Sequence, residues 1–250
     1  MKKLAVLLVI LIGFTACSEK ESNLVVSGEI KGLKKGTLYL QKVEDTMLIN
    51  VDSMEVDGDP VFSLETYLES PQMMYLYLDK VDNSKFDDRI DFFADKGQIT
   101  INTSLEKFET NAKITGSANQ EKLAEYRKMM SRFNDQNLDL IKESFEAEKE
   151  ENEEKLIEID KKYNSLLRRK YLFTVNYAIN NKDLEIAPYL ALSEVFDANI
   201  KYLDTIYTSL SPNVKKSKYG KQLKDYLKER RKEEKLEEKI QEEAEEETNS

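Results

Sequence analysis

The spacing of apolar residues changes once along this chain, and that change constrains its fold more than any other feature. From Leu24 to about Thr115 apolar residues alternate with polar ones, and beyond Gly116 they recur every three or four positions. Alternation places side chains on opposite faces of a strand, whereas a spacing of three and four places them on one face of a helix. We therefore predict an α+β fold, with a β-domain over residues 24–117 and a helical domain over residues 118–220.

Short strands separated by turn residues are expected in the first part. Leu24, Val26 and Ile30 share one face of the first predicted strand, and Leu38 and Leu40 share one face of the second. The other predicted strands are 47–54, 61–66, 73–78, 90–94, 98–102 and 112–115. Glycine and proline mark turns at 32, 35–36, 57–60, 70–71 and 96–97. Strands at this spacing predict an antiparallel β-sandwich or a partly open barrel.

Helical spacing begins after residue 117. The residues that share one predicted helical face are Leu123, Tyr126, Met130, Phe133, Asn137, Leu140 and Ile141. Residues 146–155 are charged, and the apolar pattern then resumes from Leu156 to Tyr177. We favour a hairpin that turns near Glu150 over one long helix, because a long uncapped helix would need a partner along its length. Further helices are expected from Pro188 to Val195 and over 200–210.

The last part, residues 221–250, is charged throughout. Its apolar residues Leu223, Leu227, Leu236 and Ile240 are too sparse for a continuous seam, and five glutamates lie within 242–247. Mixed charges at helical spacing predict a solvated helix that frays into disorder at its end.

Composition excludes several kinds of chemistry. The chain has no histidine, which is the commonest general base and zinc ligand, and its one cysteine is Cys17. Removal of residues 1–16 takes away Lys2 and Lys3 and leaves 36 basic against 48 acidic residues, a formal charge of −12. An acidic protein is unsuited to nucleic acid, and we expect the same charge to disfavour adhesion to anionic lipid.

Cys17 follows a short apolar run, 4–12, that is preceded by two lysines and followed by small residues. This arrangement resembles a bacterial lipoprotein signal, in which residues 1–16 are removed and the cysteine is acylated. A transmembrane anchor is the weaker interpretation, because the run is shorter than the roughly 20 residues that a span needs. We expect Cys17 to carry lipid, residues 17–23 to form a tether, and the protein to lie at the outer membrane, facing the periplasm or the cell surface.

No motif for catalysis, cofactor binding or metal binding stands out, so no such residues are predicted and the chain is not expected to be an enzyme. The acidic residues Asp79, Asp82, Asp87, Asp88 and Asp91 could ligate calcium, but they lack an EF-hand pattern and are better explained as a solvated loop. Residues 57–59 (Asp-Gly-Asp) are interpreted as a hairpin turn.

Five aromatic residues on the predicted strands have two interpretations. They are Tyr39, Tyr75, Tyr77, Phe92 and Phe93. Aromatic side chains favour half-buried strand faces, so core packing is the stronger interpretation. A ligand-binding cleft lined by these rings is the alternative.

The order of several short segments resembles a family: the uncharacterised β-domain of Bacteroidota lipoproteins that usually precedes a thioredoxin-like module of the AhpC/TSA or TlpA/ResA type. The segments are 28–32, 36–40, 51–53, 70–71, 92–93, 97–101, 116–117, 211–212 and 216–220. The resemblance implies a periplasmic thiol-disulfide role. In such proteins the thioredoxin-like module follows the segment that resembles Tyr219-Gly220, whereas here a charged helix follows and no paired cysteines occur.

Two functions remain open on these grounds. The first is a lipid-anchored, non-catalytic module that binds another protein of the cell envelope. The alternative is a lipoprotein that binds a small ligand or glycan through the β-domain. Glycoside hydrolysis by two carboxylates is a third and weaker hypothesis, because no pair of acids is singled out.

Overall fold

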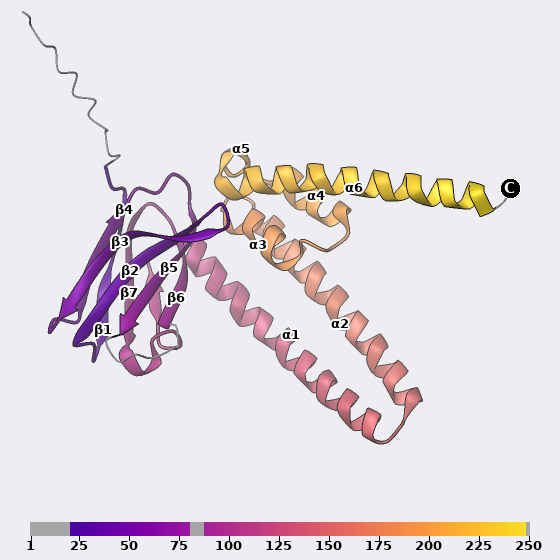
Figure 1. Cartoon of the computed structure of the whole chain (residues 1–250), viewed down its shortest axis with the longest axis horizontal. Coiled ribbons are helices and arrows are strands. Elements are labelled where there is room, and N and C mark those ends of the chain that lie inside the picture. Colours follow the sequence, from indigo (N-terminus) through magenta and orange to yellow (C-terminus); the bar gives the residue numbers. More distant parts are fainter. Residues whose placement is uncertain (1–20, 81–87, 249–250) are drawn as a thin grey trace, which may run out of the picture.

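The computed structural model describes residues 21–80 and 88–248, and it shows a β-sandwich joined to a helical body (Figure 1). One sheet has the strand order β4 (Val61–Thr66), β1 (Leu24–Lys31), β7 (Gly97–Ser104) and β8 (Lys113–Thr115). The other has the order β3 (Met47–Asp57), β2 (Lys35–Glu44), β5 (Gln72–Lys80) and β6 (Asp88–Ala94). The predicted sandwich is therefore confirmed.

The pairing of the strands differs from the prediction in one respect. β1 pairs with β7 in parallel, so that sheet is mixed and not purely antiparallel. The approach is close at Gly28, where an added Cβ would lie 1.8 Å from the carbonyl oxygen of Ile101. Only glycine leaves room for β7 beside β1 at this point.

The turn at residues 57–60 was wrongly predicted as a hairpin. β3 and β4 belong to different sheets, so this turn carries the chain from one layer of the sandwich to the other. Gly58 has a φ of 94°, and the Asp59 carboxylate accepts a hydrogen bond from the Val61 amide at 3.0 Å. These local features specify a turn, whereas packing in the core determines which strands pair with each other.

Alternate residues of both sheets form the sandwich core. The inward side chains of the first strands are those expected, Leu24, Val26 and Ile30 on β1 and Leu38 and Leu40 on β2, and all five are buried. Phe92 and Ile90 of β6 close the same core from the second sheet. Apolar residues therefore alternate along these strands because only one face of each strand packs against the other sheet.

The helical body begins with a hairpin, as predicted. Helix α1 (Ala118–Lys149) turns through 150–152 into α2 (Glu153–Asn180). Ser117 caps α1 by accepting from the Gln120 amide at 3.0 Å, and Asn152 caps α2 by accepting from the Lys155 amide at 3.0 Å. Three short helices follow: α3 (Ile186–Glu194), α4 (Ile200–Ser209) and α5 (Pro212–Lys216).

The last helix, α6 (Lys218–Thr248), corrects the expected boundary between residues 220 and 221. It starts before that boundary, and Leu223 and Leu227 are only 0% and 2% exposed. Both pack in one core with residues of α2, α3 and α4, such as Val175 and Leu203. The first turns of α6 thus belong to the helical body, and the remainder extends past it.

Hydrogen bonds and a second core fasten the helical body to the sandwich. The buried Asn119 side chain donates to Asp95 at the end of β6 (2.6 Å) and to Glu185 before α3 (3.0 Å), and it accepts from the Ile186 amide at 2.8 Å. A cluster that includes Phe93, Tyr126 and Leu190 fills the space between the sheet and the helices. The two parts therefore share a packed junction.

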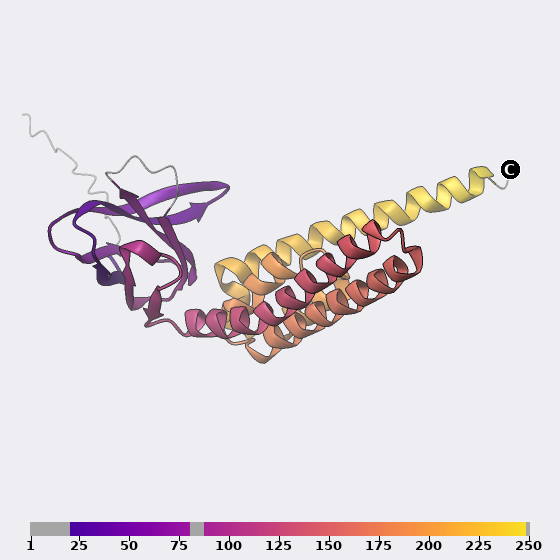
Figure 2. The same ribbon diagram turned by 90° about the horizontal axis from the view of Figure 1, so that it is seen from below.

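Two strand amides at this junction find their hydrogen-bond acceptors on the helices. The Phe93 amide donates to the Gln120 side chain at 2.8 Å, and the Met73 amide donates to the Tyr219 hydroxyl at 3.0 Å. Because buried backbone amides need partners, these contacts fix where the helices sit on the second sheet. From that base the α1–α2 hairpin and α6 both extend away from the sandwich (Figure 2).

Candidate functional site

A groove of about 790 Å³ lies where the sandwich meets the helical body. One wall is the turn between β2 and β3, another is the segment that links β4 to β5, and a third is the α5–α6 connection. Its lining residues are Lys42, Val43, Glu44, Asp45, Tyr67, Glu69, Ser70, Pro71, Gln72, Lys96, Glu185, Asn213, Lys216, Ser217, Lys218, Lys221 and Gln222. The groove is large enough for a small ligand or a headgroup.

Local sequence signals shape two of the three walls. The β2–β3 turn places Asp45 at a φ of 55°, a left-handed conformation that aspartate tolerates better than most residues. Pro212 occupies the first turn of α5. Ser217 then ends α5, since its hydroxyl donates to the Val214 carbonyl at 2.7 Å and accepts from the Gly220 amide at 3.2 Å.

Lys218 links the walls of the groove. Its backbone amide donates to the Ser70 hydroxyl at 3.1 Å, and its ammonium donates to the Val43 carbonyl at 3.1 Å and to the Gln72 side chain. Burial lowers the pKa of Lys218, and the positive charge of Lys42 lowers it further. The groove is thus an environment in which positive charges already repel one another.

Five lysines and four acids line this groove in a protein whose formal charge is −10. Two of the acids have partners: Glu44 pairs with Lys42 at 3.3 Å, and Glu185 accepts from Asn119. The ammonium groups of Lys96, Lys216 and Lys221 make no hydrogen bond or ion pair to the part of the chain that the structure describes. These three lysines are available to an anionic ligand.

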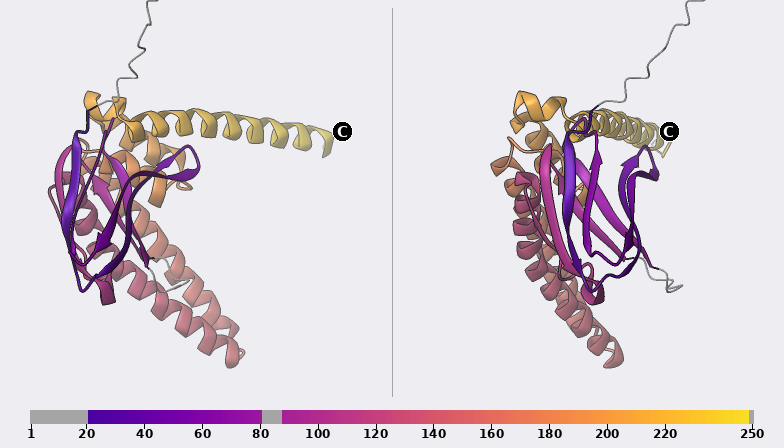
Figure 3. Two further views of the ribbon diagram at one scale, coloured as in Figure 1. Left: turned by 60° about the vertical axis from the view of Figure 1, so that its left-hand side comes forward. Right: turned by 90° about the vertical axis from the view of Figure 1, so that its left-hand side faces the viewer.

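The groove lies close to the start of the sandwich. The Asn23 side chain donates to the Leu68 carbonyl at 3.0 Å and accepts from the Leu68 amide at 2.7 Å. The Gly97 amide donates to the Asn23 carbonyl at 2.9 Å. Tyr67 precedes Leu68 in the sequence, Lys96 precedes Gly97, and both line the groove. The chain therefore enters the sandwich beside the groove. Both views in Figure 3 show α5 at the end of the molecule where the described chain begins.

The acidic residues considered for calcium are dispersed among ion pairs and solvent. Asp88 pairs with Lys80, Asp91 pairs with Arg127, and Asp79 is exposed. Asp82 and Asp87 lie outside the described residues, as does the lipidation residue Cys17. Within the described ranges there is no group of three acidic, histidine or cysteine side chains placed to hold a metal ion.

The five strand aromatics do not form a common site. Phe92 lies in the sandwich core and Phe93 in the junction, and both are fully buried. Tyr39 and Tyr77 stack on the outer face of the second sheet with ring centroids 5.9 Å apart, and the Arg89 guanidinium lies 5.3 Å from the Tyr77 ring. Tyr75 is half-buried on the same strand as Tyr77. None of the five lines the groove.

The groove lysines were missed from the sequence. They come from positions 42, 96, 216, 218 and 221, on segments that are far apart until the chain folds. The only local signal is the basic cluster at 215–221. A local basic cluster is usually solvated, so this signal alone would not have identified a site.

Fold and groove define a class: a two-part α+β protein whose β-sandwich and helical body share a basic groove. Residues 24–123 match the family described as "Domain of unknown function (DUF4369)". The match covers the whole sandwich and the first residues of α1, so the resemblance to an uncharacterised β-domain is supported. The chain matches no curated protein and no solved structure. No helix among the described residues is long and apolar enough to cross a membrane.

Proposed function

We propose that this is a lipid-anchored, non-catalytic protein of the cell envelope that binds a partner protein through its helical hairpin. The observation that carries the proposal is a row of exposed apolar residues on the outer half of α1. Leu138 and Phe145 are 62% and 61% exposed, and Ile141 lies between them. Their spacing of three and four places all three on one helical face.

The hairpin is thinly packed at this point. A hollow of about 220 Å³ runs along it, lined by Leu140, Ile141, Ser144, Leu156, Ile159, Asp160 and Tyr163. A third helix laid over this side would bury both the row and the hollow, which is how amphipathic partner helices dock. Soluble proteins rarely keep such contiguous apolar surface uncovered unless something binds it.

The anchor is the sequence-based part of this proposal. The signal before Cys17 supports acylation, and two or more acyl chains would hold the protein on a bilayer. The resemblance to lipoproteins that carry a thioredoxin-like module names a periplasmic thiol-disulfide enzyme as the first partner class to examine. The alternative, a small-ligand or glycan site built on the sheet aromatics, is weaker because Phe92 and Phe93 are both in cores.

Crosslinking in intact cells tests the partner. The full chain is compared with a variant that changes Leu138, Ile141 and Phe145 to serine, and bound proteins are identified by mass spectrometry. The matched control changes Met47 and Val61, which are equally exposed but lie on the sandwich. We expect one specific partner to be lost with the α1 variant alone. Recovery of the same proteins with all three chains would reject the hairpin as the docking surface.

Truncation after Tyr219 is not a suitable test. It would remove Leu223 and Leu227 from the helical core, so loss of binding would report unfolding.

A further inference from the structure

Six lysines of α6 form one stripe along the helix. They are Lys221, Lys224, Lys228, Lys232, Lys235 and Lys239, and all six are exposed. Their spacings of three and four residues confine them to an arc of about 80° at 3.6 residues per turn. Leu223 and Leu227, which face the helical core, lie about 120° from the middle of that arc. The stripe therefore faces away from the core.

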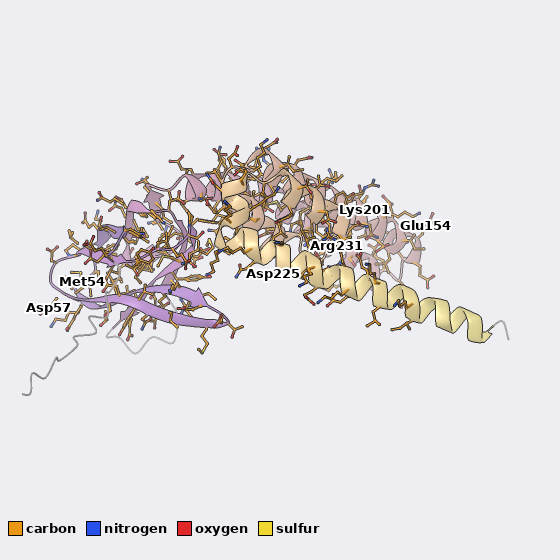
Figure 4. The ribbon with its side chains drawn as sticks, turned by 90° about the horizontal axis from the view of Figure 1, so that it is seen from above. Met54, Asp57, Glu154, Lys201, Asp225 and Arg231 are labelled. Atoms are coloured by element: carbon orange, nitrogen blue, oxygen red, sulfur yellow. The ribbon has the colours of Figure 1, made fainter. Side chains whose placement is uncertain are left out.

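The stripe and the groove meet at Lys221, which belongs to both. Lys96, Lys216 and Lys218 continue the positive charge from the helix into the groove. Figure 4 looks onto this side of the molecule, with α6 nearest the viewer and Asp225 and Arg231 labelled on it. The basic residues thus run from the end of the sandwich along α6 as far as Lys239.

This basic side lies at the end of the molecule where the described chain begins. In Figure 1 the start of the sandwich, α5 and α6 all lie along the upper edge. Residues 18–22 separate Cys17 from Asn23. Even fully extended, the chain from Cys17 to Asn23 spans only about 20 Å. A lipid on Cys17 would hold this edge of the molecule within that distance of a bilayer.

We propose that the α6 lysine stripe and the groove lysines form a surface that docks on the phosphate headgroups of an anionic bilayer, with α6 parallel to the membrane. This proposal rests on the lipid anchor of the proposed function. Phosphate groups suit the site because lysine ammonium groups bind them as point charges. Leu236, which is 60% exposed, lies about 40° beyond one edge of the stripe and can enter the headgroup region.

The acidic charge of the whole protein does not oppose this docking. Charges further away than the Debye length, about 8 Å at physiological ionic strength, are largely screened. Asp225 and Glu229 flank the stripe, and Glu229 pairs with Lys232 at 2.8 Å. Asp45 and Glu69 are the groove acids without a partner among the described residues. The surface is mixed, and its positive charge is confined to the stripe: residues 233–238 already hold four glutamates against one lysine, and only acidic charges follow Lys239.

Energy transfer on vesicles tests the orientation. The acylated full-length protein is reconstituted into two kinds of vesicle, one of phosphatidylcholine alone and one that also contains phosphatidylglycerol. Both kinds carry an acceptor dye on a lipid headgroup. Because acylation blocks Cys17, a cysteine introduced as Leu236→Cys is the single site for a donor dye. A dye on Glu154→Cys at the far end of the hairpin is the positional control.

We expect phosphatidylglycerol to increase energy transfer from position 236 but not from position 154. Replacing Lys224, Lys228, Lys232 and Lys235 with glutamine should lower the ratio of docked to undocked protein by about fivefold for each lysine. Salt at 1 M, where the Debye length is about 3 Å, should have a similar effect. The matched variant changes Lys128, Lys142, Lys149 and Lys161 of the hairpin and should leave the transfer unchanged.

Equal transfer in both kinds of vesicle would overturn the docking surface. An equal loss in the hairpin variant would also overturn it, because total charge would then be the cause. Mass spectrometry of Cys17 tests the anchor separately. If no acyl chain is found, sedimentation of the full chain with phosphatidylglycerol vesicles decides the surface: co-sedimentation that needs the stripe lysines supports it, and its absence rejects it.

Discussion

The β-sandwich and the helical body bury their apolar residues in different ways. The sandwich closes one core between two sheets, and that core draws on the sandwich alone. The helical body has a core of its own, but a second cluster is shared with the sheet at the junction. Its hairpin and α6 then extend beyond both. The sandwich is therefore the base of the molecule, whereas the exposed surfaces available for binding lie on helices that pack on that base.

Phe92 and Phe93 test whether the sandwich core and the junction are energetically separate. They are neighbours on β6 and both are fully buried, but Phe92 faces the sandwich core and Phe93 faces the helices. Either change to alanine should lower the free energy of unfolding by about 3–5 kcal/mol. Hydrogen exchange should then rise first in α1 and α3 for Phe93→Ala, and first in the strands for Phe92→Ala. Identical exchange patterns would show that the two parts unfold as one unit.

Two leucines of α6 distinguish its packed part from its extended part. Leu227→Ala should cost about 2–5 kcal/mol in urea denaturation, because a buried side chain leaves a cavity. Leu236 is 60% exposed, so Leu236→Ala should change stability by less than about 0.5 kcal/mol. A large effect of the second variant would mean that the extended part of α6 is covered within the protein.

Gly220 tests how tightly α6 starts against α5. A Cβ at this position would lie 2.0 Å from the Val214 carbonyl oxygen, so the backbone must shift to accept it. Gly220→Ala should destabilise the protein by about 1–3 kcal/mol in thermal or urea unfolding. The adjacent exposed variant Lys221→Ala is the control and should be close to neutral. A neutral Gly220→Ala would show that the α5–α6 connection adjusts freely.

Alkaline pH should lower the free energy of unfolding through Tyr126 at the junction, and this effect is small. The Tyr126 hydroxyl is hydrogen-bonded to Thr174 at 2.9 Å, and burial raises the pKa of Tyr126 well above its usual value of 10. The folded state then binds the Tyr126 hydroxyl proton more tightly than the unfolded state does. The contribution of this hydroxyl to stability is therefore complete below pH 10 and is lost as the pH rises above 10. From pH 9 to pH 11 the wild type should lose about 1 kcal/mol more than Tyr126→Phe. Equal losses would mean that Tyr126 ionises in the folded protein as it does in the unfolded chain.

Local patterns were sufficient for most elements of the fold. Alternation over 24–115 predicted the strands, and helical spacing predicted the α1–α2 hairpin with its turn near Glu150. These predictions succeeded because the period of burial is set by the backbone geometry of each element. The cap at Ser117 and the proline at the start of α5 are likewise local, since each acts within a few residues of itself.

Pairings between distant residues could not be predicted in the same way. The parallel pairing of β1 with β7 joins residues about seventy positions apart, and the turn at 57–60 gives no sign that it connects two sheets. Leu223 and Leu227 looked too sparse for a seam along a helix. They are nevertheless buried, because two leucines are enough for one turn of a helix that other helices surround. In each case the partner, and not the local pattern, decides the outcome.

The charge of this protein shows the same division. Sequence alone determined the net charge, the absence of histidine, the cysteine at position 17 and the change from strand to helix spacing, because these are properties of composition and of neighbouring residues. Folding is what brings lysines 42, 96, 216, 218 and 221 together in one groove of an acidic protein. The physical reason is that screening makes electrostatic binding a matter of the charges within several ångströms, and folding alone determines which charges those are.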